Sequence, residues 1–284
     1  MVLNDTFTLR NGVKIPQLGL GTWFIDDDKA PEAVRAAAEI GYRHFDTAQA
    51  YMNERGVGEG VRTSGIPRDQ LFVTTKLAAE AKDYETATAA IDGSLAKAGL
   101  DYFDLMLIHS PQPWADFRGG EYADGNREAW RALEDAYKAG KLHSIGVSNF
   151  KEKDLENIAS SCTIQPMVNQ LLVHVGNTPA ALIEYCQRHD ILVEGYSPVA
   201  HGAILSQPTI AEMAEKYGVS VAQLCIRYDL QLGTLPLPKT ANPAHMRENA
   251  AIDFEISDED MMALKSLESV DYGEYAMFPV FSRK

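Results

Sequence analysis

Short apolar runs alternate with segments of helical spacing along most of this chain of 284 residues. The runs lie at residues 43–45, 71–75, 104–108, 144–147, 167–169, 191–196 and 234–238. Their regular separation by helical patterns is typical of parallel strands joined by helices. The pattern therefore predicts an α/β fold with a parallel sheet.

Two further segments have clear end signals. Residues 87–98 place apolar side chains at helical spacing, and Gly99 follows where a left-handed cap residue is favoured. Residues 257–268 begin with a serine suited to the N-cap and carry acids in the first turn. An Asn-Gly pair at 11–12 separates two short apolar runs. We expect a C-terminal packing helix and an N-terminal β-hairpin.

Polar side chains recur at the ends of the expected strands. Asp46, Lys76 and His109 each close one run, one β/α repeat apart. Eight strands, each followed by a helix, would close into a barrel that gathers such residues on its carboxyl rim, whereas an open doubly wound sheet would spread them along an edge. No linker or repeat divides the chain. We predict a single (β/α)8 TIM barrel domain over residues 1–284.

The glycine cluster Gly56, Gly58 and Gly60 has the spacing of a dinucleotide fingerprint without its context. It follows no expected strand, and Glu59 lies within it. We interpret it as a site of close helix packing.

Composition narrows the range of partners and locations. The chain has 40 acidic and 26 basic residues, a net charge of -14, which repels polyanions. Nucleic acid and membrane surfaces are therefore not expected as partners. The three cysteines lack metal-ligand spacing, and no leader or long apolar run is visible. We expect reduced thiols, no bound metal and a cytoplasmic location.

The strand-end residues suggest proton transfer. Tyr51 follows Asp46 closely, and a phenol, with a pKa of about 10, gives up its proton readily at neutral pH only beside a cation. Lys76 supplies a cation, Asp46 would hold it, and His109 would orient a carbonyl. Each residue alone is more often structural, but the four together favour chemistry on a carbonyl group.

These four residues occur with the segments GLGTW, GVSNF, YSP and LPKTANPAHMREN. In this combination the chain resembles the aldo-keto reductase family over most of its length, and within it the bacterial type with a short C-terminal tail, similar to diketogluconate and aldehyde reductases. The resemblance implies metal-independent reduction of aldehydes or ketones with NADPH or NADH. Tyr51 would be the general acid, supported by Asp46, Lys76 and His109. A small-molecule carbonyl partner and a monomer are also implied.

The resemblance further implies a dinucleotide site. Ser148, Asn149 and Gln170 would bind the nicotinamide carboxamide. Tyr196 would stack on the ring, and Ser197 with the backbone of Val199 would face the pyrophosphate. Further cofactor-binding roles are implied for Gly21, Thr22, Asp46, Lys239, Thr240, His245, Glu248 and Asn249.

The adenosine end departs from the family pattern. His245 stands where an arginine is common, and Arg247 lies about 200° further around the helix. An imidazole binds a phosphate less strongly than a bidentate guanidinium does. We expect NADPH to be accepted through Lys239, and NADH to be used appreciably.

The substrate pocket is expected to include Tyr51, His109, Trp23, Ser110 and Trp114. Ser110 stands where the family often has tryptophan, which predicts a roomier and more polar pocket. Broad, modest activity on small aldehydes and ketones would follow.

Other functions remain open at this point. A dedicated sugar or keto-acid reductase would share the same residues. A cofactor-sensing regulatory subunit would bind the dinucleotide without turnover, and the intact set of four residues argues against it. A metal-dependent hydrolase would need a third ligand beside His44 and His109, and His44 is better explained as a packed strand residue.

Overall fold

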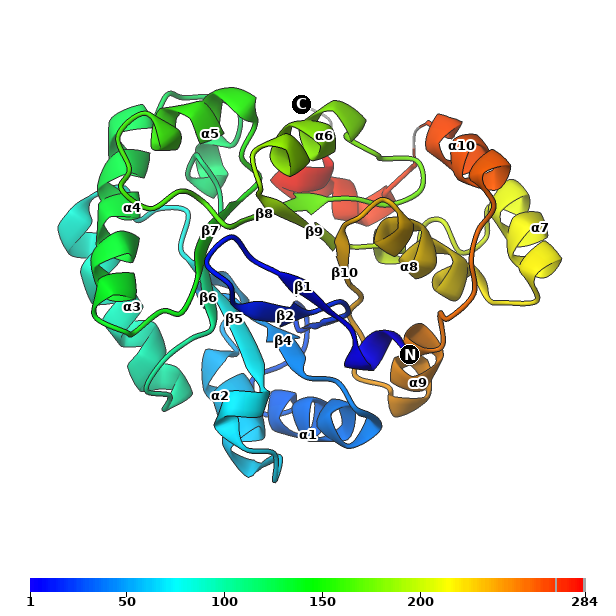
Figure 1. The fold of residues 1–284 in the computed structure, drawn as a ribbon, viewed down its shortest axis with the longest axis horizontal. Coiled ribbons are helices and arrows are strands. Elements are labelled where there is room, and N and C mark those ends of the chain that lie inside the picture. The colour runs from blue at the N-terminus through cyan, green and yellow to red at the C-terminus, as the bar shows by residue number, and fades with distance from the viewer. Residues whose placement is uncertain (269, 283–284) are drawn as a thin grey trace.

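The computed structural model describes residues 1–268 and 270–282. Within this part of the chain, eight parallel strands form one continuous sheet in sequence order (Figure 1). The strands are β3 (Leu20–Gly21), β4 (His44–Asp46), β5 (Phe72–Leu77), β6 (Leu105–Ile108), β7 (Ile145–Ser148), β8 (Val168–Leu172), β9 (Leu192–Tyr196) and β10 (Leu235–Leu237).

The two ends of this sheet meet. The amide of Gly19 donates to the carbonyl of Pro236 at 3.2 Å, and that of Gly21 donates to Pro238 at 3.0 Å. The predicted barrel is confirmed. The two-residue strand β3, which completes it, was not among the predicted strands.

Helices surround the barrel (Figure 1). One α-helix follows each barrel strand except β9, which two α-helices follow. The helix α10 comes after α9, near the C-terminus of the chain. No helix in the described ranges is both long enough and apolar enough to cross a bilayer. The helices are α1 (Ala30–Ile40), α2 (Glu54–Thr63), α3 (Tyr84–Ala98), α4 (Ala123–Lys138), α5 (Glu152–Ala159), α6 (Ala180–Arg188), α7 (Pro208–Tyr217), α8 (Val221–Gln231), α9 (Pro243–Ala250) and α10 (Asp258–Ser266).

Both predicted helix ends are confirmed. Gly99 caps α3 in the left-handed conformation, with φ 62°. At α10, the hydroxyl of Ser257 accepts a hydrogen bond from the amide of Asp260.

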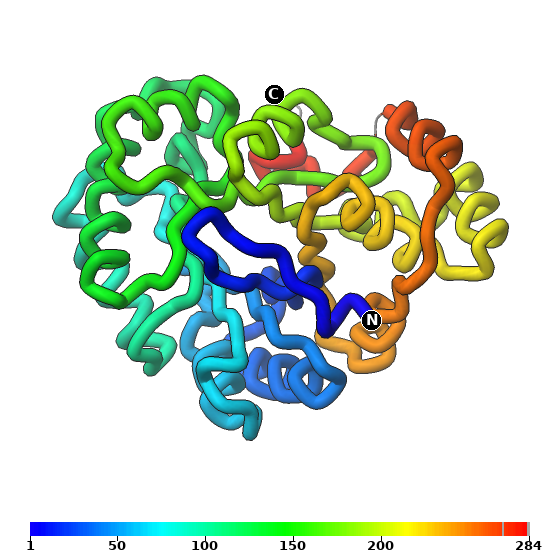
Figure 2. The backbone as a smooth tube through the Cα atoms, viewed as in Figure 1, coloured from blue at the N-terminus to red at the C-terminus, as the bar shows by residue number. Residues whose placement is uncertain are grey.

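The N-terminal hairpin closes the end of the barrel that lies away from the strand-end polar residues. β1 (Thr6–Thr8) and β2 (Lys14–Pro16) cross the ring of strands in Figures 1 and 2. Asn11 Nδ2 donates to the carbonyl of His143 at 2.9 Å, just before β7 begins. The carboxyl ends of the strands are thus left for a site on the opposite side.

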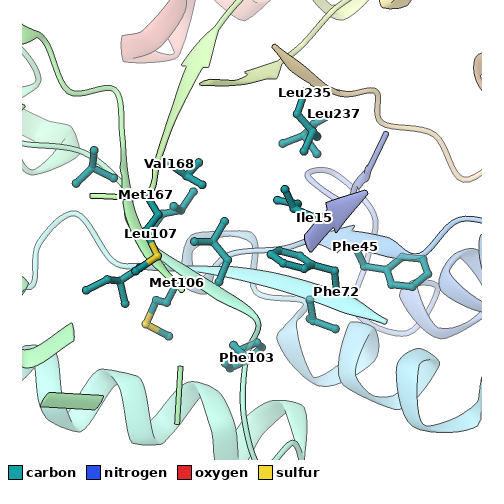
Figure 3. Packing of buried hydrophobic residues seen from close by; sticks show 14 of the residues in the cluster. Ile15, Phe45, Phe72, Phe103, Met106, Leu107, Met167, Val168, Leu235 and Leu237 are labelled. Carbon is teal, nitrogen blue, oxygen red and sulfur yellow. The ribbon is translucent and has the colours of Figure 1, made fainter. Parts of the chain in front are cut away.

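The hydrophobic core is formed by the barrel strands and by the faces of the hairpin and helices that pack against them. Figure 3 shows Ile15 of the hairpin close to Phe45 and Phe72, and Met106 close to Leu107. All six residues of β5 are buried, as expected of a parallel strand covered on both faces. This packing fixes the positions of the residues at the strand ends.

The three glycines at 56, 58 and 60 lie in α2, where neighbouring helices approach closely. A Cβ atom at Gly58 would overlap the carbonyl of Ala98, and one at Gly60 would lie 2.6 Å from Val34 Cβ. The interpretation as close helix packing agrees with this geometry.

Candidate active site

Three proton-handling side chains meet at the carboxyl end of the barrel. Lys76 of β5 is fully buried, and its Nζ donates hydrogen bonds to Asp46 Oδ1 at 2.6 Å and to the Tyr51 hydroxyl at 3.1 Å. The carbonyl of Thr47 accepts a third hydrogen bond at 2.9 Å. Tyr51 reaches this point because the chain turns in a short 3-10 segment, Gln49–Tyr51, directly after β4. All three ammonium hydrogens are therefore used.

The charges of this group follow from burial and contact. Burial alone would lower the pKa of Lys76, but Asp46 and Tyr51 outweigh it and raise that pKa above its ordinary value. Burial raises the pKa of Tyr51, and the Lys76 charge opposes that rise. Burial thus changes the pKa of Tyr51 more than the Lys76 charge does, although the sequence suggested the cation as the main influence. At neutral pH a charged ammonium lies beside a protonated phenol.

His109, just past β6, completes the predicted group of four. Its ring lies edge-on to that of Tyr51, with centroids 5.6 Å apart. Burial, with a smaller contribution from Lys76, lowers the pKa of His109 well below its usual value. The imidazole is therefore neutral at neutral pH. It can donate a hydrogen bond to a carbonyl oxygen without bringing a second cation into the site.

A group of amide and hydroxyl side chains lies beside these four. Asn149 adopts the left-handed backbone conformation, φ 64°, which asparagine tolerates better than most residues. Its Nδ2 donates to the His109 carbonyl and to Ser148 Oγ, both at 3.1 Å, and its Oδ1 accepts from the Tyr196 hydroxyl at 2.8 Å. Ser148 Oγ donates to the Gln170 carbonyl at 2.9 Å. The amide group is thus held at a fixed position relative to His109.

One cavity of about 860 Å³ connects these residues with the others expected to bind the cofactor. This volume lies within the range of ligand sites. Amides and hydroxyls lie near Tyr51, and Lys239 and His245 supply basic groups elsewhere in the lining. These donors fit a nicotinamide dinucleotide. The expected cofactor residues that line the cavity are Gly21, Thr22, Asp46, Ser148, Asn149, Gln170, Tyr196, Ser197, Val199, Lys239, Thr240, His245, Glu248 and Asn249.

The expected substrate residues divide into two groups. Trp23, Tyr51, His109 and Trp114 line the cavity. Ser110 lies outside this lining, so the structure gives its expected role in substrate binding no support. Ser110 is fully buried. Its hydroxyl accepts a hydrogen bond from Gln112 N, and its carbonyl accepts one from a lysine outside the cavity lining. A buried Ser110 adds no polar group to the pocket.

The cavity lining also includes an aromatic group that was not predicted from the sequence. The His201 ring stacks on Tyr275, with centroids 4.2 Å apart, and lies edge-on to Trp23 at 5.2 Å. Phe278 contacts Trp23 edge-on at 5.1 Å, and Phe24 also lines the cavity. The run of aromatic residues in the C-terminal tail was visible in the sequence, but nothing local indicated which way the tail would fold.

The start of α8 also lines the cavity, through residues 220–222. Its N-cap is a capping box in which Ser220 Oγ accepts from Gln223 N. The S-x-x-Q pattern was readable as a helix start. Its position beside the cavity was not.

A parallel barrel that holds a protonated phenol, a buried ammonium and an amide group at one dinucleotide-sized cavity fits a nicotinamide-dependent oxidoreductase. Comparison with known proteins gives the particular family. The profile of the Aldo/keto reductase family matches residues 17–269. The chain belongs to this family and is an NAD(P)H-dependent oxidoreductase.

Named relatives and solved structures agree with this assignment. The chain is 43% identical over 267 residues to the glyoxal reductase of Bacillus subtilis (strain 168), and the match covers 93% of each chain. It is 41% identical to the 9,11-endoperoxide prostaglandin H2 reductase of Trypanosoma cruzi (strain CL Brener), covering 92% of this chain and 90% of the relative.

The same fold is found in solved members. An aldo/keto reductase from Brucella melitensis superposes with a TM-score of 0.86 at 40% identity, covering 93% of this chain and 99% of the other. A Bombyx mori aldo-keto reductase in complex with NADP has a TM-score of 0.85 at 32% identity, covering 98% of both chains.

Proposed function

We propose that the chain reduces the carbonyl group of aldehydes and ketones to an alcohol, with Tyr51 as the general acid. The observation that carries this proposal is the Lys76 ammonium between Asp46 and the Tyr51 hydroxyl, at 2.6 and 3.1 Å. A charged ammonium favours the phenolate that remains when Tyr51 gives its proton to the carbonyl oxygen. Asp46 keeps the ammonium charged and in place.

The nicotinamide cofactor supplies the hydride when it is bound. The protein holds the other reactants in line. His109 donates to the carbonyl oxygen as a neutral imidazole, and the amides of Asn149 and Gln170 bind the carboxamide of the cofactor. Tyr196 packs against the ring, and Ser197 binds the pyrophosphate.

Both NADPH and NADH serve as cofactors in this proposal. His245 and Lys239 line the cavity, whereas Arg247 lies outside the lining and donates to the Pro243 carbonyl of its own helix. The 2′-phosphate of NADPH therefore meets a lysine and an imidazole, without a bidentate guanidinium. An NADPH preference above about a thousandfold, or roughly 4 kcal/mol, would contradict this.

Small neutral aldehydes, including dicarbonyls such as glyoxal, are the proposed substrates. The support comes from the 43% identity to a glyoxal reductase and from the rings of Trp23, Trp114 and Phe278 that line the cavity. A dedicated keto-acid reductase would be expected to place a second cation beside Tyr51 for the substrate carboxylate, because Lys76 already uses its three hydrogens on Asp46, Thr47 and Tyr51. Initial rates across aldehydes, ketones, keto-sugars and keto acids distinguish the two.

The first experiment is the Tyr51→Phe variant, assayed with NADPH and with NADH. Loss of the general acid should lower kcat by at least about 100-fold while cofactor binding persists. Tyr275→Phe is the matched control, because Tyr275 lines the same cavity at its mouth and should keep near-normal turnover. Tight cofactor binding by the unmutated protein without turnover of any carbonyl would favour the cofactor-sensing subunit.

A further inference from the structure

A buried carboxyl group lies inside the barrel, one hydrogen-bonded residue away from Asp46. Glu194 of β9 has no exposed surface, and its Oε2 accepts a hydrogen bond from Gln170 Nε2 at 2.8 Å. A fully buried acid is costly unless it is neutral or paired. Besides this hydrogen bond, Glu194 is connected through Gln170 to the group of four residues at the site.

Gln170 joins Glu194 to the group of four. The same Nε2 also donates to Asp46 Oδ2 at 2.9 Å, so both amide hydrogens are used on carboxyl oxygens. Asp46 in turn accepts from Lys76, which contacts Tyr51. The two acceptors fix which end of the Gln170 amide faces inward, because only the NH2 group can donate to both.

Within the described part of the chain, no charged side chain forms an ion pair with Glu194 at neutral pH. His44 Nε2 lies 3.9 Å from Glu194 Oε1 and is instead hydrogen-bonded to Thr74 Oγ1 at 2.9 Å. Oε1 has no hydrogen-bond partner among the described residues. Asp46 and His44 of β4, Lys76 of β5 and the nearby Tyr51 are the groups that act on it.

We propose that Glu194 is a positioning residue that fixes the amide of Gln170 against Asp46, and that loss of its proton sets the alkaline limit of carbonyl reduction. This inference rests on the proposed function, in which Tyr51 is the general acid. Glu194 is too deep to contact a substrate, so it acts through Gln170 and through its charge.

The direction of the effect follows from the charges. Burial and the nearby Asp46 raise the pKa of Glu194 to about 8, whereas burial lowers that of His44 to about 3, so neither is charged at neutral pH. Above its pKa, Glu194 adds a second negative charge beneath the site. That charge raises the pKa of Tyr51, and a weaker acid protonates the carbonyl more slowly.

The test is the pH dependence of kcat for carbonyl reduction by the full-length Glu194→Gln variant. Glutamine keeps the shape and can still accept from Gln170, but it cannot ionise. We expect the alkaline fall in kcat to move upward by about one pH unit or more, with kcat near pH 7 within about threefold of the unmutated enzyme. A role in packing alone would change kcat at all pH values alike.

Asp229→Asn is the matched control. Asp229 is another fully buried carboxyl, on α8, whose pKa is raised well above its usual value by burial. Among residues 1–268 and 270–282 no hydrogen bond links its carboxyl group to Asp46, so its removal should leave the pH profile of kcat unchanged. A shift of equal size in this variant would overturn the proposal, as would an alkaline limb in Glu194→Gln that superposes on that of the unmutated enzyme.

A second measurement covers the case in which Glu194→Gln does not fold. The unmutated protein, labelled with 13C at the glutamate carboxyl carbon, is titrated by NMR. One glutamate with a midpoint that matches the alkaline limb of kcat supports the proposal, and titration of every glutamate below about pH 6 overturns it. Full activity of Tyr51→Phe would instead refute the proposed function itself, so the two failures are distinguishable.

Discussion

At the scale of the residue, His245 is the side chain on which the proposed use of both cofactors depends. It is exposed on the first turn of α9 and lines the cavity, while Arg247 of the same helix lies outside the lining. A guanidinium binds a phosphate with two parallel hydrogen bonds, which an imidazole cannot do. The chain thus offers the 2′-phosphate a weaker site than an arginine at the same position would.

Replacing His245 by arginine should raise the NADPH-to-NADH ratio of kcat/KM by about tenfold or more. The gain should appear in the KM for NADPH, because the new contact is made equally before and during the reaction. Arg247→Ala is the control and should leave the ratio unchanged. Steady-state kinetics with both cofactors measure this. An unaltered ratio in His245→Arg would show that the imidazole is not placed at the phosphate.

Sequence reasoning succeeded for residues at strand ends and failed for residues whose direction depends on distant partners. Asp46, Tyr51, Lys76 and His109 come together because parallel strands share a carboxyl rim. Ser110 follows His109 directly but turns into the wall, where Gln112 and a lysine bind it. Glu194 was visible as an acid in an apolar run, but its link to Asp46 through Gln170 required the closed barrel.

At the scale of the element, glycines on two sides of α2 set how closely it packs against α1 and α3. Gly58 lies against the C-terminal turn of α3, and Gly60 lies against Val34 of α1. Glycine in a helix interior costs about 1 kcal/mol relative to alanine, so such a cluster needs a packing reason. The close approach of the neighbouring helices supplies it.

Gly58→Ala should destabilise the fold by about 1–3 kcal/mol, since the added Cβ has no space beside the Ala98 carbonyl. Gly93→Ala, in the interior of α3, is the opposite case, because nothing lies within 4 Å of its added Cβ. That variant should stabilise by about 0.5–1 kcal/mol. Urea unfolding of both variants measures the difference. Equal effects would mean that α2 can shift to make room.

The elements that could be predicted were those with a repeating pattern. The apolar runs located β4 to β10, and end signals located α3 and α10. β3 has only two residues, Leu20 and Gly21, which is too short for any periodicity. The C-terminal tail gave no pattern either, since its 3-10 turns at Gly273–Met277 and Pro279–Phe281 are ordered by rings elsewhere in the chain.

At the scale of the whole molecule, buried ionisable groups set opposing pH dependences of stability. Burial lowers the pKa of His44 to about 3 and of His174 to about 4. Unfolded histidines bind protons below about pH 6.5, so stability falls as the pH drops through that value. Burial raises the pKa of Glu194 to about 8 and that of Asp229 well above 3.8. The contribution of these carboxyl groups to the free energy of unfolding decreases as the pH rises above the pKa of an unfolded carboxyl group.

We expect the free energy of unfolding to be greatest near about pH 6.5, where the histidines have lost their effect and the carboxyls continue to act. His109 and His201, whose pKa values are also lowered by burial, add to the acid slope. Asp229→Asn should flatten the fall above pH 6.5 and steepen the fall below it, because it removes a contribution that decreases from the ordinary carboxyl pKa upward. Urea midpoints measured from pH 5 to pH 9 test this, and a curve that is level throughout would refute it.

The hydrogen bonds that close the barrel have a consequence for how the protein is made. Gly19 and Gly21 donate hydrogen bonds to Pro236 and Pro238. The first strand of the barrel therefore cannot pair with the last one until the last one has left the ribosome. The cavity is lined by residues from both ends of the chain, from Gly21 to Val280. Until then the nascent chain has no complete dinucleotide site, and its cofactor cannot stabilise it during synthesis. Early strands and helices must hold together by their own packing for most of translation.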